Sequence, residues 1–260
     1  MTALDTANTL LAADSAGPDP AWRRFYTIGG ICAALYVAFA LVVPGVMVAA
    51  VSDFWDILVD PAALLVFITD NKLYWHIVQG GVLEASILLI ITFAAVYLTL
   101  KHVDRVLAAI GAIISITTQL LFMAYYPVLL GLVYLSDQYA TAGAARQASL
   151  EASAEALIAQ NSAFNPIYEA LMGVGILFLS LAMLKGVFSR FVAYLGIATS
   201  VAAFVGLSLY PIVGLGYFFW WAFFVVWLLA VGWKLYKLGR TRQPVGTTPP
   251  RAASQPAQTA

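Results

Sequence analysis

Two glutamates lie inside long apolar stretches of this sequence, where a carboxylate has little water to solvate it. Glu84 follows "YWHIVQGGVL" and Glu169 precedes "ALMGVGILFLSLAML". They lie 17 and 16 residues before Lys101 and Lys185, which is about 25 Å along a helix. A charged acid at the middle of a bilayer costs about 2.5–3.5 kcal/mol, and burial favours its neutral form. An acid at this depth is expected to exchange protons or to bind a polar group.

Two prolines lie at matching depths on the spans that return from these segments. Pro127 cannot donate to the carbonyl of Met123, and Pro211 cannot donate to that of Leu207. Both freed carbonyls are about 25–27 Å from the basic ends of their helices, level with the glutamates. Two interpretations remain open. In one, each protonated glutamate donates to a freed carbonyl and only satisfies a kink; in the other, the two acids line an outward-opening polar pocket.

Polar side chains nearby extend this candidate site. Tyr126 and Tyr210 lie about a turn further out, and Gln119 lies about a turn further in. His76 shares a helical stripe with Glu84, about 12 Å away. The candidate binding residues are Glu84, Glu169, Tyr126, Tyr210, Gln119 and His76, and the expected kinks are at Pro44, Pro127 and Pro211.

No catalytic residue, metal site or cofactor is predicted. The HExxH, GxSxG, CxxC and Walker patterns are absent. His76 and His102 are expected at opposite membrane faces, so they cannot share a metal. The basic C-terminal residues suit anionic lipid headgroups, and no nucleic acid is expected as a partner.

The elements that position these residues are predicted to be membrane-spanning helices. The chain is 62% hydrophobic and 10% charged, whereas a soluble domain carries about a quarter charged residues. Uncharged runs predict an all-α, six-span domain over residues 25–238, between disordered tails at 1–24 and 239–260. The spans are expected within 25–52, 76–100, 106–136, 166–184 and, divided by the turn "YPIVGLG" at 210–216, within 190–234.

The basic residues predict the orientation of the chain in the membrane. Eleven of the 13 Lys and Arg residues lie at the two ends of the chain or in the connections after the second and fourth spans. Only Lys72 and Arg146 lie on the other side. The positive-inside rule therefore places both termini in the cytoplasm.

Two outer connections have helical character of their own. Asp60 and Pro61 are expected to start a short helix, as N-cap and first helical residue. Residues 143–160 are expected to form an amphipathic helix on the membrane surface. We favour interfacial anchoring for these segments over a role as lids.

The second and third spans share a pattern with the fourth and fifth. The matched residues are Glu84 with Glu169, Lys101 with Lys185, Arg105 with Arg190, Gly111 with Gly196, and Tyr126-Pro127 with Tyr210-Pro211. Their separations of 84 or 85 residues predict parallel copies of a helix hairpin, related by an axis along the membrane normal.

The chain also resembles a family of bacterial six-span membrane proteins that is defined only as a domain of unknown function. The stretches that carry the resemblance are "DPAALLVFITDNKLYW", "YLTLKHVDRVLAAIGAI" and "LKGVFSRFVAYLGIA". The resemblance implies a bacterial inner (plasma) membrane and brings no catalytic residues with it.

These features favour a non-enzymatic binding or transport-type bundle that takes a small amphiphilic or cationic molecule through an outward-opening pocket. Discontinuous spans at matched positions point to such a site. One alternative is an intramembrane enzyme that uses the same two acids on a lipid or isoprenoid. Another is a structural or regulatory partner of a second membrane protein. Beyond the lipid bilayer, the sequence leaves the substrate and the oligomeric state open.

Overall fold

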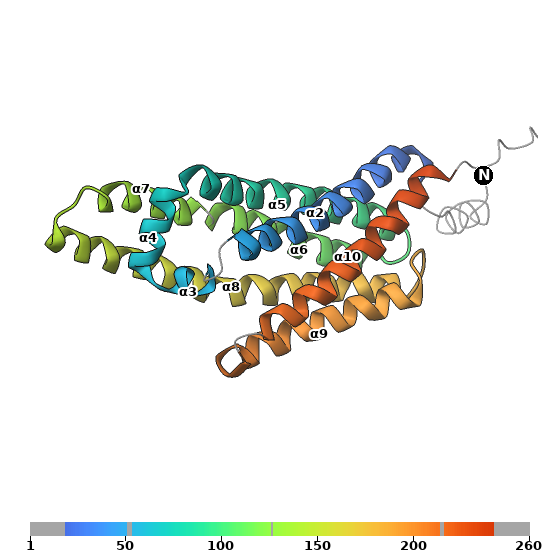
Figure 1. Cartoon of the computed structure of the whole chain (residues 1–260). Helices are drawn as coiled ribbons and strands as arrows, with labels where there is room; N and C mark the ends of the chain where they lie inside the picture. Colours follow the sequence, from blue (N-terminus) through green and yellow to red (C-terminus); the bar gives the residue numbers. More distant parts are fainter. Residues whose placement is uncertain (1–18, 51–53, 126, 214–215, 242–260) are drawn as a thin grey trace, which may run out of the picture.

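The computed structural model describes residues 19–50, 54–125, 127–213 and 216–241, and within these it is all-helical. A 3₁₀ turn, η1, precedes nine α-helices in the described part of the chain (Figure 1). The elements are η1 (Pro20–Trp22), α2 (Arg23–Ala50), α3 (Phe54–Val59), α4 (Pro61–Asp70), α5 (Lys72–Leu100), α6 (Arg105–Tyr125), α7 (Pro127–Tyr139), α8 (Ala144–Met183), α9 (Arg190–Val213) and α10 (Gly216–Arg240).

Six of these helices form a ring in chain order. Each of α2, α5, α6, α8, α9 and α10 packs against the next, and α10 returns to pack against α2. Stacked aromatic side chains fill the middle: the ring centroids of Phe93 and Trp227 are 6.5 Å apart, and those of Phe224 and Trp227 are 6.3 Å apart. The centre of the bundle is therefore packed with side chains from α5 and α10.

Glycines allow the ring helices to approach closely. A Cβ on Gly30 of α2 would lie 2.6 Å from the Gly232 carbonyl oxygen of α10, and a Cβ on Gly111 of α6 would lie 2.9 Å from the Gly175 carbonyl oxygen of α8. Only glycine fits at such contacts, and close backbone approach is how helices associate in lipid. Three ring helices begin at an arginine and carry a buried glycine six residues later. These pairs are Arg23 and Gly29, Arg105 and Gly111, and Arg190 and Gly196.

Five helical segments in the described residues are long and apolar enough to cross a membrane. They are Pro20–Val42, Leu83–Leu100, Arg105–Tyr139, Ala144–Met183 and Trp220–Arg240. The apolar stretch Arg190–Gly206 of α9 is shorter. The structure thus supports an all-α protein of the membrane type, with five candidate spans where the sequence predicts six.

The α5–α6 and α8–α9 connections of the ring meet at one end of the bundle. Lys185, after α8, lies 2.8 Å from Asp104, between α5 and α6. The hydrogen bond and charge of Lys185 lower the pKa of the Asp104 carboxyl. Lys101 also lies 5.7 Å from the ring centroid of Trp22, at the start of the chain's first helices. Figure 1 shows the start of α2 and the end of α10 at this same end.

A helical cap with its own core covers the other end. Its parts are α3, α4, α7, the start of α5 and the first half of α8 (Figure 1). The buried residues of the cap core are Leu64, Leu65, Phe67, Ile68, Trp75, Leu132, Val133, Leu150 and Ala154. The apolar side chains that α4 buries thus pack against protein, and the expected anchoring of this segment at the membrane surface stays a prediction.

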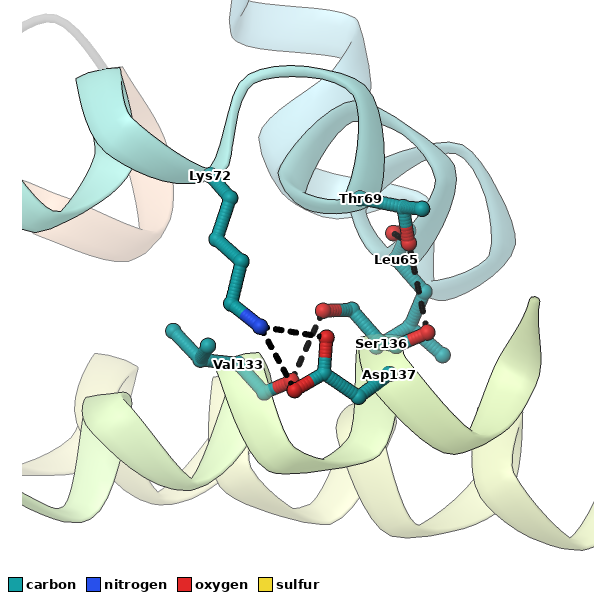
Figure 2. A network of polar contacts seen from close by, with 6 residues as sticks. All are labelled: Leu65, Thr69, Lys72, Val133, Ser136 and Asp137. Carbon is teal, nitrogen blue, oxygen red and sulfur yellow. Dashed lines mark hydrogen bonds and ion pairs between the residues drawn. The ribbon is translucent and has the colours of Figure 1, made fainter.

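Polar contacts also hold the parts of the cap together (Figure 2). The Lys72 ammonium, in the first turn of α5, lies 2.7 Å from the Asp137 carboxylate of α7. The Thr69 hydroxyl of α4 donates to the carbonyl oxygens of Leu65 and Ser136, at 3.0 and 3.2 Å. Both sides of the ion pair are about half-exposed, so its contribution to stability is about 0–1 kcal/mol.

The predicted start of α4 is confirmed. The Asp60 carboxylate accepts hydrogen bonds from the backbone N–H groups of Ala62 and Ala63, at 2.9 and 3.2 Å, and Pro61 is the first helical residue. Proline suits that position because its missing N–H would have had no partner inside the helix.

The separate surface helix predicted over residues 143–160 is not observed. Instead α8 is one helix of 40 residues, about 60 Å long, which is twice the thickness of a bilayer core. Pro166 lies inside it. Proline removes one backbone hydrogen bond, and the packing of Leu150 and Ala154 in the cap core holds the outer half in line with the inner half. The predicted span 106–136 falls on α6 and α7, on either side of Tyr126, which lies outside the described residues.

The spacing of the predicted hairpin repeat agrees with the burial pattern of one helix pair, α6 and α9, but not with that of the other pair, α5 and α8. Ala108, Gly111 and Ser115 of α6 are buried, and so are Ala193, Gly196 and Ser200 of α9, 85 residues later. In α5 and α8 the core positions match at a separation of 83 residues instead, as for Phe93 and Ile176, both fully buried. The two glutamates are 85 residues apart, so they do not occupy equivalent positions on their helices.

Candidate functional site

Glu169 lies on the interior face of α8. Its side chain is only 4% exposed. It shares a helical stripe with Gly173 and Ile176, which are also buried. A Cβ on Gly173 would lie 3.1 Å from the Ala203 Cβ of α9, so this stripe packs against α9 and the core. Glu169 is thus a buried carboxyl. It lies one helical turn from Gly173, where α8 and α9 pack closely.

A polar pair lies beside this carboxyl, between α6 and α8. The Gln119 amide nitrogen donates to the Tyr168 hydroxyl at 2.9 Å. Gln119 is 1% exposed, and Tyr168 is the residue that precedes Glu169. Ser115, about one turn before Gln119 on the same side of α6, is buried as well. Their partner helix is α8.

Aromatic rings extend the site toward the end of α6 that precedes α7. The ring centroids of Phe122 and Tyr168 are 4.6 Å apart, and those of Tyr125 and Phe164 are 4.1 Å apart and nearly parallel. Phe122 and Phe164 are also within 6.4 Å. Residues 122 and 125 on α6 and 164 and 168 on α8 thus form an aromatic cluster. Tyr168 belongs both to this cluster and to the hydrogen-bonded pair with Gln119.

Several buried polar atoms at this site have no hydrogen-bond partner among the described residues. They are the Gln119 side-chain oxygen, the Ser115 hydroxyl and the Tyr125 hydroxyl. An unsatisfied buried polar atom costs about 1–3 kcal/mol. Atoms of this kind are ready to bind water or a polar ligand group, and their position on one side of α6 identifies the α6–α8 seam as the candidate site.

Glu84 is not part of this site. Its side chain is exposed, whereas Phe93, nine residues further along α5, is fully buried. Nine residues are about two and a half turns, so the two side chains lie on opposite faces of the helix. The expectation that both glutamates face the interior of the bundle therefore does not hold for Glu84.

Of the remaining predicted site residues, only His76 has a described side chain. The His76 side chain is exposed near the start of α5. Tyr126 lies outside the described residues, and so do the side chains of Tyr210, Pro44, Pro127 and Pro211. The pairing of each glutamate with a proline-freed carbonyl stays a prediction.

The sequence interpretation missed Tyr168 and Phe164. Their signal was available: "FNPIYE" places the two aromatic residues four apart, hence on one helix face, directly before Glu169. Phe164 was overlooked because the fourth span was expected to begin only at Pro166, and Tyr168 because attention went to the adjacent carboxyl.

Two shallow depressions lie elsewhere, on the cap. One, of about 450 Å³, lies over α4 and includes Val66 and Asp70. The other, of about 320 Å³, lies between α4 and α8 and includes Asp60, Glu151 and Glu155. No group of three or more His, Cys, Asp or Glu side chains suited to a metal ion occurs among the described residues.

Comparisons of the chain with protein families, with curated proteins and with solved structures found no match. What the chain does must therefore be inferred from its own residues: a buried carboxyl, a buried amide–phenol pair and an aromatic cluster inside a bundle of apolar helices.

Proposed function

We propose that this chain is a non-enzymatic binding or transport-type bundle of a bacterial plasma membrane, with six spans and both termini in the cytoplasm. The span that adds to the five candidate spans is α9. Its apolar stretch Arg190–Gly206 is followed by further helix to Val213. Its binding site is centred on Glu169, Tyr168 and Gln119, and opens outward between α6 and α8. The burial of the Glu169 carboxyl beside the Gln119–Tyr168 hydrogen bond is the observation that carries this proposal.

The chemistry of the site suits a small amphiphilic cation. A carboxylate pairs with a positive charge, and aromatic faces attract cations while covering apolar groups. Phe122, Tyr125 and Phe164 supply such faces on the outer side of Glu169. The Gln119 side-chain oxygen and the Tyr125 hydroxyl supply further acceptors. One molecule with an ammonium group and an apolar body would engage all of these groups.

The position of Glu84 weighs against the enzyme alternative. General acid–base work on one substrate by these two acids requires both carboxyls at one reacting position. Glu84 is exposed on the face of α5 opposite Phe93, and Glu169 is buried on the interior face of α8. The third alternative, a structural partner of another membrane protein, draws on that same exposed face of α5.

The test is cation binding by the purified full chain in lipid nanodiscs, with tetraphenylphosphonium as the probe. Glu169→Gln keeps the size and hydrogen-bonding capacity of the side chain but removes the charge. At an effective dielectric constant of about 20, two charges about 6 Å apart attract by roughly 3 kcal/mol, and desolvation offsets part of this, so the variant should weaken binding by roughly 10- to 100-fold. Glu84→Gln makes the same substitution at an exposed position and serves as the matched control.

The proposal fails if Glu169→Gln binds the cation as tightly as the unmodified chain, or if Glu84→Gln weakens binding equally. Thermal unfolding of both variants shows whether any loss of binding follows from a loss of structure.

A further inference from the structure

The outer half of α5 presents an apolar stripe that nothing in the described chain covers. Leu73 is 75% exposed, Ile77 62% and Ile87 47%. Glu84 is exposed on the same stripe. A Cβ on Gly80 would meet no atom within 4 Å. The stripe is thus largely apolar, with His76 at its edge, Glu84 as its one carboxyl and Gly80 near its middle.

The spacing of the stripe is that of a helix–helix seam. Residues 73, 77, 80, 84 and 87 are separated by alternating steps of four and three. An average of 3.5 residues keeps one line of side chains facing a parallel partner helix in a coiled coil. One face of any helix shows nearly this spacing, so Glu84 and Gly80 are what distinguish this face from a plain lipid contact. Gly80 lets a partner backbone approach closely at the middle of the seam.

We propose that the occupant of this stripe is a second copy of the same chain, with α5 packed against α5 about a two-fold axis along the membrane normal. Copies of one chain insert in the same orientation, so each Glu84 faces the other at the same depth. In a parallel, in-register seam, equivalent positions meet each other. A polar residue at one such position sets register and partner number.

The carboxyl group is self-complementary in this arrangement. In its neutral form each Glu84 carboxyl donates one O–H bond and accepts one from its copy, so the pair satisfies both groups without water. The apolar spans carry no lysine or arginine at this depth, and Lys72 is already paired with Asp137. A second copy therefore offers Glu84 a hydrogen-bonding partner that lipid tails do not.

The experiment is disulfide cross-linking of single-cysteine variants in liposomes. The native Cys32 is first replaced by alanine. Ile87→Cys then places a thiol in the seam, and Val205→Cys places one on α9, three places away around the ring. The two positions are matched, at 47% and 48% exposed. Copper-catalysed oxidation at high lipid-to-protein ratio should give a dimer band for Ile87→Cys and at least tenfold less for Val205→Cys.

Second substitutions then test the role of the carboxyl. Glu84→Leu should reduce the Ile87→Cys dimer several-fold, whereas Glu84→Gln should keep it, because an amide also donates and accepts. Both changes are at an exposed position, and thermal unfolding verifies that the bundle is intact. Equal cross-linking at both cysteines, no cross-linking at Ile87→Cys, or a dimer that Glu84→Leu leaves unchanged would each overturn the proposal. A lipid-covered stripe, or one that binds a different protein, gives the second of these results.

Discussion

The contact between α2 and α10 closes the ring, and replacing Gly30 by alanine is the sharpest test of it. The new Cβ would lie 2.6 Å from the Gly232 carbonyl oxygen and 2.7 Å from the Tyr236 backbone nitrogen. Ordinary contacts begin at 3.4 Å, so the first contact is about 0.8 Å too short. Both obstructing atoms belong to the backbone and cannot rotate away. The two helices must therefore separate.

The magnitude follows from two opposing effects. Overpacking of a well-packed core costs about 1–3 kcal/mol, and a contact with rigid backbone belongs to the upper part of that range. Alanine in place of a helical glycine recovers up to about 1 kcal/mol. The net loss is about 1–2 kcal/mol, which corresponds to a fall in Tm of roughly 2–8 °C for a chain of this size.

The assay uses the single cysteine as its reporter. Cys32 is buried on α2, two residues from Gly30, so a thiol-reactive dye reports the loss of packing around this helix during a temperature ramp. Gly80→Ala is the matched control: its Cβ meets nothing within 4 Å, and alanine is still small enough for the α5 seam proposed above. Its Tm should stay the same or rise. A Gly30→Ala protein that is as stable as Gly80→Ala would refute the close α2–α10 contact.

Three further predictions concern the ends of the bundle. Lys185 lowers the pKa of Asp104, so their contact contributes its full stability above the unfolded-state pKa of about 3.9. This stability is lost as the pH falls through the lower pKa of the folded state. Lys185→Met should abolish this part of an acid-unfolding profile. Leu65→Ala should destabilise the cap by about 2–5 kcal/mol, measured as faster hydrogen exchange in the cap. The dye reactivity of Cys32 should stay unchanged, because the cap has its own core. A rise in that reactivity would contradict a separate core. Lys72→Met should lower the free energy of unfolding by no more than about 1 kcal/mol. A larger fall in Tm would show that the half-exposed ion pair contributes more to stability than this.

The positions of the helices could largely be predicted from the sequence, because charge marks the ends of apolar runs. Arg105 and Arg190 begin α6 and α9, and Asp60 caps α4 as its side-chain chemistry requires. The cap could not be predicted, because its core joins residues from four separate stretches. The continuity of α8 was equally hidden, since Pro166 signals a break when read locally.

The direction in which each glutamate points could not be read from the sequence either. In a soluble helix, polar residues mark the outer face. In a helix surrounded by lipid, both faces are apolar, so periodicity does not separate core from surface. Glu84 and Glu169 therefore occupy similar sequence contexts but opposite environments, one exposed on α5 and one buried on α8. The matched pattern around them made the two acids look equivalent.

The proposed site requires that the Glu169-bearing face of α8 pack inside the bundle against α9. Gly173 and Ala203 test it most directly, because a Cβ on Gly173 would lie 3.1 Å from the Ala203 Cβ, within a few tenths of an ångström of disulfide geometry. With Cys32 replaced by alanine, the Gly173→Cys and Ala203→Cys double variant should form an intramolecular disulfide, scored by the loss of both thiols to a maleimide mass tag. Leu171→Cys with Ala203→Cys, which places one thiol on the exposed face of α8, should not. A disulfide in the second pair and none in the first would place Glu169 outside the bundle and contradict the account.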